Sequence, residues 1–146
     1  MHYTFVVILM VSLNSPSIDT IGLGRTQSVA VEGVLVCGNS PASNVKIKLY
    51  DDDRGIDTDD LMGETRTDQY GHFYVKGHTR EFTDIDPKVN IYHRCNYGGI
   101  CYKKLTFWVP KDYISAGKQP SMKYNMGTIQ LALKYKGEST DCINKR

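Results

Sequence analysis

Hydrophobic and polar residues alternate along much of this chain with a period of two, and no long stretch has the 3.6-residue period of an amphipathic helix. The stretch "VKIKLY" shows the alternation most clearly, because Val45, Ile47 and Leu49 are apolar while lysines and a tyrosine occupy the positions between and after them. Such a pattern is typical of a strand with one buried face. We therefore expect these three side chains to point into a core.

Six other stretches are rich in apolar, β-branched or alternating residues and are separated by turn-forming residues. The strands that they predict cover residues 28–37, 61–67, 72–77, 87–95, 101–110 and 126–135. Within them, Phe73 and Val75 are expected to face the core. Ile129, Leu131 and Leu133 are expected on one face of the last strand. About seven short strands at these spacings predict an all-β sandwich.

The amino terminus has a different character from the rest of the chain. Residues 1–13 form an apolar run behind a short n-region, and small and polar residues follow it. A bilayer span needs about 20 apolar residues, so the run is too short to cross a membrane. We interpret residues 1–24 as a secretory signal peptide and residues 25–146 as one mature domain. The alternative is an apolar N-terminal strand.

The four cysteines all lie beyond this leader, at positions 37, 95, 101 and 142. An even number in a secreted chain predicts two disulfides, for which three pairings exist. The chain has no C-x-x-C pair, so a zinc site is not expected. Pairing Cys95 with Cys101 would close a short loop and leave Cys37 for Cys142, but the sequence alone leaves the choice open.

Charge is unevenly distributed along the mature chain. Residues 25–100 hold 9 Lys/Arg and 12 Asp/Glu, whereas residues 101–146 hold 9 Lys/Arg and only 3 Asp/Glu. The basic C-terminal third suggests a face for anionic lipid or glycan, unless the fold mixes the two halves on its surface. A nucleic-acid partner is not expected for a secreted chain of such modest charge.

Several stretches together carry a family resemblance. They are "GRTQSVAVEGVLVCG", "PASNVKIKLYDDD", "TDQYGHFYVKGHTREFTDIDPKVNIYHRC" and "GESTDC". From about Gly24 to Cys142 the chain resembles the nematode transthyretin-like family of secreted proteins. The resemblance implies a transthyretin-like (prealbumin-like) sandwich of two antiparallel sheets with seven to eight strands. It also implies secretion and paired cysteines, but no defined biochemical activity.

The transthyretin fold also has an enzymatic branch, which hydrolyses 5-hydroxyisourate. That branch carries a first-strand histidine, an arginine in the following region and a C-terminal Tyr-Arg-Gly-Ser. Here residues 28–37 contain no histidine, and the nearest C-terminal match is Tyr135-Lys136-Gly137-Glu138. We therefore expect no enzymatic activity and no cofactor. The histidines at 72, 78 and 93 have no recognised metal-binding spacing and are expected to be hydrogen-bonded at turns or strand ends.

Two binding functions remain. In the strand 101–110, Tyr102, Lys104 and Trp108 fall on the face opposite Leu105, and a row of basic and aromatic groups suits an anionic headgroup. This predicts an extracellular binding or bridging protein that recognises cell-surface lipid such as phosphatidylserine, a glycan or a receptor. The alternative for these residues is that Trp108 packs in the sandwich and Lys104 is merely solvated.

The second binding function is a carrier of a small hydrophobic ligand. Transthyretin itself carries hormone in a channel between subunits, and the face of the last strand that bears Thr128, Gln130, Ala132 and Lys134 is small or polar, as a channel could be. A solvated strand face has the same composition.

The stretch "DDDRGIDTDD" follows a predicted strand and forms an acidic loop at one end of the sandwich. An EF-hand is excluded, because its sixth position is Ile56 rather than glycine and its twelfth is Met62 rather than glutamate. A looser cation site remains as a hypothesis. Its ligands would be Asp51, Asp53, Asp57 and Asp59. The alternative is a solvated loop whose aspartates cap turns.

Overall fold

The fold comes from a computed structural model, which describes residues 23–53 and 58–143. Nearly all of the predicted signal peptide therefore lies outside the described residues. The described chain forms ten strands and one short 3-10 turn, η1 (Lys111–Tyr113). The strands are β1 (Arg25–Cys37), β2 (Ser40–Pro41), β3 (Lys46–Asp51), β4 (Asp60–Arg66), β5 (His72–Glu81), β6 (Pro87–His93), β7 (Tyr102–Trp108), β8 (Ser115–Ala116), β9 (Tyr124–Gln130) and β10 (Ser139–Asp141).

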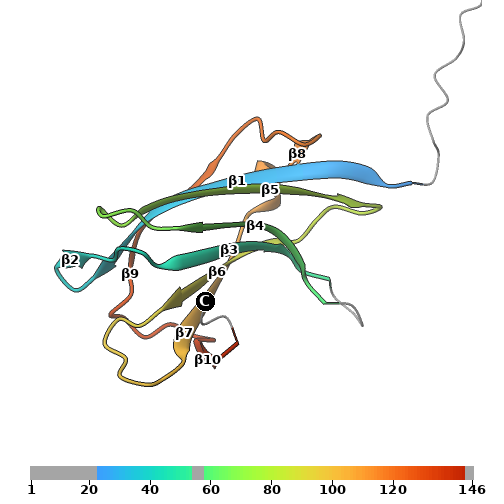
Figure 1. Ribbon diagram of the computed structural model, residues 1–146. Helices are drawn as coiled ribbons and strands as arrows, with labels where there is room; N and C mark the ends of the chain where they lie inside the picture. The colour runs from blue at the N-terminus through green and yellow to red at the C-terminus, as the bar shows by residue number, and fades with distance from the viewer. Residues whose placement is uncertain (1–22, 54–57, 144–146) are drawn as a thin grey trace, which may run out of the picture.

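These strands form two sheets that face each other (Figure 1). One sheet has the order β10-β7-β6-β3-β4, and the other is built on the long strand β1, which pairs with β2, β5, β8 and β9. All pairings are antiparallel except that of β1 with β9, which is parallel. The predicted all-β sandwich of two sheets is confirmed. The strands beyond the predicted seven to eight are only two or three residues long.

The core lies between the two sheets and is made by the alternating positions. Ile47, Leu49, Phe73 and Val75 are buried there as predicted. Leu131 is also buried, but the prediction for Leu133 is wrong, since its side chain is 59% exposed. The reason is that β9 ends at Gln130, where the chain turns, so period-two alternation no longer applies beyond it.

The disulfides form the pairs Cys37–Cys95 and Cys101–Cys142, with Cα–Cα distances of 5.8 Å and 4.4 Å. The first joins the end of β1 to the residues after β6, so it links the two sheets. The second joins the residue before β7 to the residue after the short strand β10, within one sheet. The Cys95–Cys101 pairing therefore does not form, because β10 pairs with β7 and brings Cys142 to Cys101. Cys95 and Cys101 are close in sequence, but the fold gives each of them a distant partner.

No helix in residues 23–53 and 58–143 is both long and apolar enough to cross a bilayer.

Candidate functional site

The sheet that contains β7 presents a basic and aromatic outer face. Cross-strand register pairs Lys88 with Trp108 and Tyr92 with Lys104, so these side chains lie on one side of the sheet. Their neighbours in sequence, such as Val89 and Ile91, lie in the core. We use "outer face" for the side chains on this side of the sheet. They include Lys46, Lys48, Tyr50, Lys88, Asn90, Tyr92, Tyr102, Lys104, Thr106 and Trp108, together with Glu64 and Arg66 on β4 and Ser139 and Asp141 on β10.

A polar network lies at the centre of the outer face. Thr106 Oγ1 donates to Asn90 Oδ1 at 2.8 Å, and Asn90 Nδ2 donates to the Tyr92 hydroxyl at 3.4 Å. The Tyr92 side chain is covered by its neighbours and only 3% exposed. Burial raises the pKa of Tyr92 well above its ordinary value, so this hydroxyl stays protonated. The centre is therefore an ordered, neutral floor rather than a loose surface.

Cations surround this floor and lie against aromatic rings. The distances from cation to ring centroid are 5.8 Å for Lys48 and Tyr92, 5.6 Å for Lys88 and Trp108, and 5.7 Å for Arg94 and Tyr102. These lie within cation–π range. Lys46 is buried among them, and burial is the main cause that lowers its pKa, against the charge of Glu64.

The structure places Tyr102, Lys104 and Trp108 on the outer face, and Trp108 is 54% exposed. Trp108 therefore does not pack in the sandwich. The three residues do not form one compact patch, since Tyr102 and Trp108 are six residues apart on one strand, or roughly 20 Å at the usual rise. Their role in binding remains a prediction.

At the Trp108 end of the outer face, two carboxylates neutralise the charge of Lys88. Lys88 Nζ lies 2.5 Å from Asp52 and 2.6 Å from Asp59. Burial works to lower the pKa of Lys88, but its hydrogen bonds to the two carboxylates outweigh burial and raise the pKa. The predicted cation ligand Asp59 is thus engaged by a lysine.

A different trio of carboxylates meets where β3 ends. Ligand oxygens of Asp51, Asp53 and Glu81 all lie within 4.8 Å of one another. Asp57 falls outside the described residues. Burial is the main cause that raises the pKa of both Asp51 and Glu81, and neighbouring carboxylates add to it. Sequence reasoning missed Glu81 because only the fold brings the end of β5 beside this loop.

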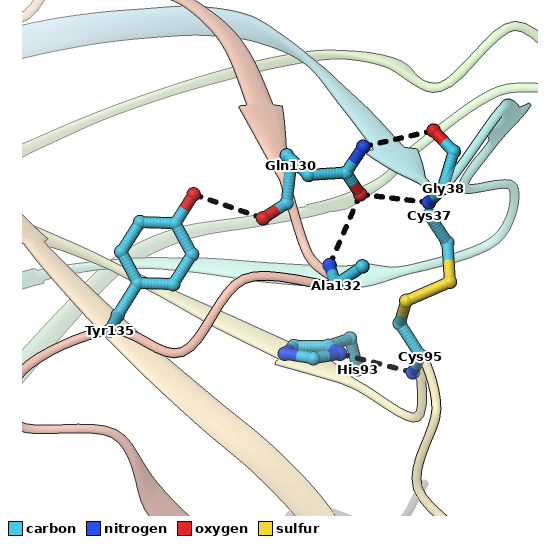
Figure 2. Close-up of a disulfide and its surroundings, with 7 residues drawn as sticks. All are labelled: Cys37, Gly38, His93, Cys95, Gln130, Ala132 and Tyr135. Atoms are coloured by element: carbon cyan, nitrogen blue, oxygen red, sulfur yellow. Dashed lines mark hydrogen bonds between the residues drawn. A yellow bond between two sulfur atoms is a disulfide. The ribbon is translucent and has the colours of Figure 1, made fainter.

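The three histidines occupy different environments. His72 and His78 are exposed on β5, whereas His93 is 2% exposed at the end of β6. Its Nδ1 accepts a hydrogen bond from the backbone N–H of Cys95 at 3.1 Å (Figure 2). Accepting this bond places the proton of the neutral ring on Nε2. His93 therefore acts as a hydrogen-bonded strand-end residue.

Gln130, a residue predicted to line a ligand channel, instead joins parts of the fold. Its side chain accepts from Gly38 N at 2.8 Å and donates to Gly38 O at 2.9 Å, and it also accepts from Ala132 N at 3.1 Å (Figure 2). The Tyr135 hydroxyl donates to the Gln130 carbonyl at 3.0 Å. The Gln130 side chain therefore holds the turn that follows β1.

A disulfide-linked sandwich with an exposed basic and aromatic sheet face is an architecture suited to extracellular binding domains. The family model described as "TTR-52: Transthyretin-like family" matches residues 32–110. The chain belongs to the transthyretin-like family.

Curated relatives from Caenorhabditis elegans are similar over most of their length. Transthyretin-like protein 33 is 48% identical over 82% of this chain and 85% of the relative. Transthyretin-like protein 5 is 50% identical over 84% and 88% of the two chains, and transthyretin-like protein 2 is 40% identical over 84% and 86%. The similarity thus spans most of this chain.

Proposed function

We propose that this chain is a secreted, extracellular recognition protein that binds an anionic cell-surface ligand through its outer face. The observation that carries the proposal is the row formed by Tyr102, Lys104 and Trp108 on one face of β7, with the Trp108 ring open to solvent. The two disulfides support secretion, because such bonds persist in oxidising compartments.

The chemistry of this row fits a ligand that is both anionic and partly apolar. Lysine ammonium groups attract phosphate or carboxylate, and tyrosine and tryptophan rings sit well where an apolar region meets water. Phosphatidylserine-containing lipid and acidic glycans both offer such anionic groups, and a receptor with an acidic surface would fit as well. Binding of this kind weakens as salt screens the charges.

A carrier of a small hydrophobic ligand receives less support from the described residues. One surface hollow of about 240 Å³ is lined by charged and polar side chains, among them Arg25, Asp84 and Lys111. Another, of about 340 Å³, is an open depression beside Tyr74 and Met122. Neither offers an enclosed apolar lining of the kind that small-molecule sites have.

Vesicle and glycan binding tests the proposal. The mature domain, residues 25–146 with both disulfides intact, should be retained by phosphatidylserine-containing vesicles or by an immobilised acidic glycan at low salt, and released as salt rises. Tyr102→Ala/Lys104→Gln should weaken retention several-fold. The matched control Tyr74→Ala/Lys118→Gln changes the same residue types at exposed positions outside the outer face and should not. Binding to neither ligand above the level of neutral vesicles and neutral glycan would overturn the proposal.

A further inference from the structure

The outer face carries its side chains in rows that cross the sheet from strand to strand. Cross-strand register places Lys88 beside Trp108 and Tyr92 beside Lys104, and the row that contains Thr106 lies between these two. Successive rows follow one another along β7 at two-residue steps, or roughly 7 Å. Each row has its own chemistry, so the outer face is not one uniform basic patch.

The row at Trp108 combines an open aromatic ring with carboxylates. Trp108 is 54% exposed, and the ammonium group of Lys88 lies 5.6 Å from its ring centroid. Lys88 pairs with Asp52 at 2.5 Å and with Asp59 at 2.6 Å, so one positive charge meets two negative charges. Together these three groups carry net negative charge, which disfavours a phosphate or carboxylate at this end of the outer face.

The middle row offers ordered hydrogen-bonding groups. Thr106 is exposed, and its Oγ1 donates to Asn90 Oδ1 at 2.8 Å, so the hydroxyl oxygen can still accept a hydrogen bond from a ligand. Asn90 in turn donates to the Tyr92 hydroxyl, which holds its amide in place. A fixed hydroxyl acceptor of this kind suits a ligand that carries hydroxyl groups of its own.

The row at Lys104 carries the positive charge. Lys46 and Arg66 lie in the same row by register, although Lys46 is buried. Among the described residues Lys104 takes part in no ion pair, and its side chain is partly exposed, so its ammonium group is available to a ligand. Lys104 lies four residues from Trp108 on β7, which corresponds to roughly 13 Å along the strand.

Carboxylates lie on both sides of this positive row. Asp52 and Asp59 lie beside Lys88 on one side, and on the other side Asp141 is in register with Tyr102. A uniformly anionic surface would bring its negative groups against these carboxylates as well as against the positive row. The outer face is better matched by a ligand that places one acidic group at the positive row and neutral, hydroxyl-bearing groups toward the tryptophan.

We infer that the outer face binds an acidic oligosaccharide along β7, with a neutral sugar ring stacked on Trp108 and a carboxylate or sulfate at Lys104. The inference rests on the proposed function and assigns its ligand. The C–H bonds on one side of a sugar ring form an apolar, weakly positive face, which suits the negative face of an indole ring. Hydroxyl groups at the rim of the sugar can donate to Asp59, whose side chain is 35% exposed, and to Thr106 Oγ1.

The first experiment titrates the mature domain with two matched ligands. One is a hyaluronan oligosaccharide, in which acidic and neutral sugars alternate, and the other is the same oligosaccharide with its carboxyl groups reduced to alcohols. The acidic form should bind more tightly, and added salt should remove this advantage while the affinity of the reduced form stays the same. Trp108 is the single tryptophan of the chain, so both ligands should change its fluorescence emission.

The second experiment uses variants to separate the two contacts, with calorimetry as the measurement of affinity. Trp108→Ala should weaken binding of both ligands by about tenfold, and Trp108→Phe should restore much of the affinity because a smaller ring still stacks. Lys104→Gln should lower the affinity for the acidic form to that for the reduced form, and should leave the reduced form unaffected. The control Tyr74→Ala/Lys118→Gln should bind like the wild type. Thermal unfolding checks that each variant is folded.

The outcomes separate this inference from the function on which it rests. If the oligosaccharide does not bind, while phosphatidylserine-containing vesicles or a polyglutamate peptide bind in a way that depends on Lys104, the assigned ligand is wrong and the proposed function stands. If Lys104→Gln weakens binding of the oligosaccharide but Trp108→Ala does not, charge alone attracts the ligand and the stacked arrangement is wrong. If no anionic ligand is bound at all, the proposed function fails first.

Discussion

His93 is the residue whose chemistry depends most on its burial. Its Nδ1 accepts from Cys95 N–H, while its Nε2 is buried without a hydrogen-bond partner. Glu138 Oε2 is likewise buried without a partner, and the Glu138 charge acts on His93 together with that of Lys103. Burial dominates these influences and lowers the pKa of His93. Protonation would also turn Nδ1 into a donor facing the Cys95 N–H.

This environment predicts a loss of stability in mild acid. Because the pKa of His93 is lower in the folded chain than in the unfolded chain, the unfolded state takes up the proton more readily, and stability falls as pH drops below about 6.5. We expect the unfolding midpoint of the wild type to fall by several degrees between about pH 7.5 and about pH 5. His93→Leu should flatten the profile in this window, and the exposed control His72→Gln should not. An unchanged slope in His93→Leu would contradict the prediction.

Single residues were predictable where one local pattern determines their environment. Ile47, Leu49 and Phe73 are buried because period-two alternation alone selects one face of a strand. The partners of His93 and of the acidic loop were not predictable. Glu81 reaches Asp51 only because β5 of one sheet packs beside β3 of the other, and no local spacing records that packing.

At the scale of elements, two glycines control how closely the sheets meet. β4 and β5 belong to different sheets and lie side by side along one edge of the sandwich. A Cβ on Gly63 would overlap the carbonyl oxygen of Lys76, and a Cβ on Gly77 would overlap that of Met62. Both contacts are with backbone carbonyl oxygens and not with the end of a flexible side chain, so a side-chain rotation cannot relieve either overlap. The close approach of the two strands therefore depends on the absence of these side chains.

Gly77→Ala should destabilise the fold by about 1–3 kcal/mol, because the added methyl group forces the backbones of β4 and β5 apart. Gly98→Ala is the matched control. A Cβ at that position meets no heavy atom within 4 Å, so its unfolding free energy should be near that of the wild type. Chemical denaturation with both disulfides intact measures the difference. Equal free energies for Gly77→Ala and Gly98→Ala would show that the contact is readily relieved.

The strands themselves were easier to predict than their partners. The turn residues around Gly38 and Gly71, and the alternation of apolar and polar residues between these turns, predict strands where the structure has them. The disulfide pairing, however, follows from β10, a three-residue strand in a polar tail that carries no apolar pattern. The end of β9 depends in the same way on the bonds of Gln130 to Gly38, 92 residues away in sequence.

At the scale of the whole molecule, the gathering of carboxylates at one end of the sandwich has a cost. The fold partly mixes the basic C-terminal third with the acidic residues that precede it, because Lys111 pairs with Asp86 and Lys123 pairs with Glu32. Asp51, Asp53 and Glu81 repel one another, and Asp51 is buried while its Oδ1 accepts from Asp86 N at 2.7 Å. The raised pKa values of Asp51 and Glu81 mean that the folded state ionises them less readily than the unfolded state. Their contribution to stability is therefore lost as pH rises through their folded-state pKa values.

Asp51→Asn removes one charge and keeps the acceptor for Asp86 N. We expect it to stabilise the domain by on the order of 1 kcal/mol at neutral pH, with the difference vanishing in acid, where the wild-type carboxyl is also neutral. The same three carboxylates also form a candidate cation site, in which Glu81 joins two of the predicted ligands, Asp51 and Asp53. On that hypothesis, millimolar calcium should raise the unfolding midpoint of the wild type and leave that of Asp51→Asn unchanged. Thermal unfolding with and without calcium measures both effects. Stabilisation by Asp51→Asn without any calcium shift in the wild type would mean that the cluster is an electrostatic cost and not a cation site.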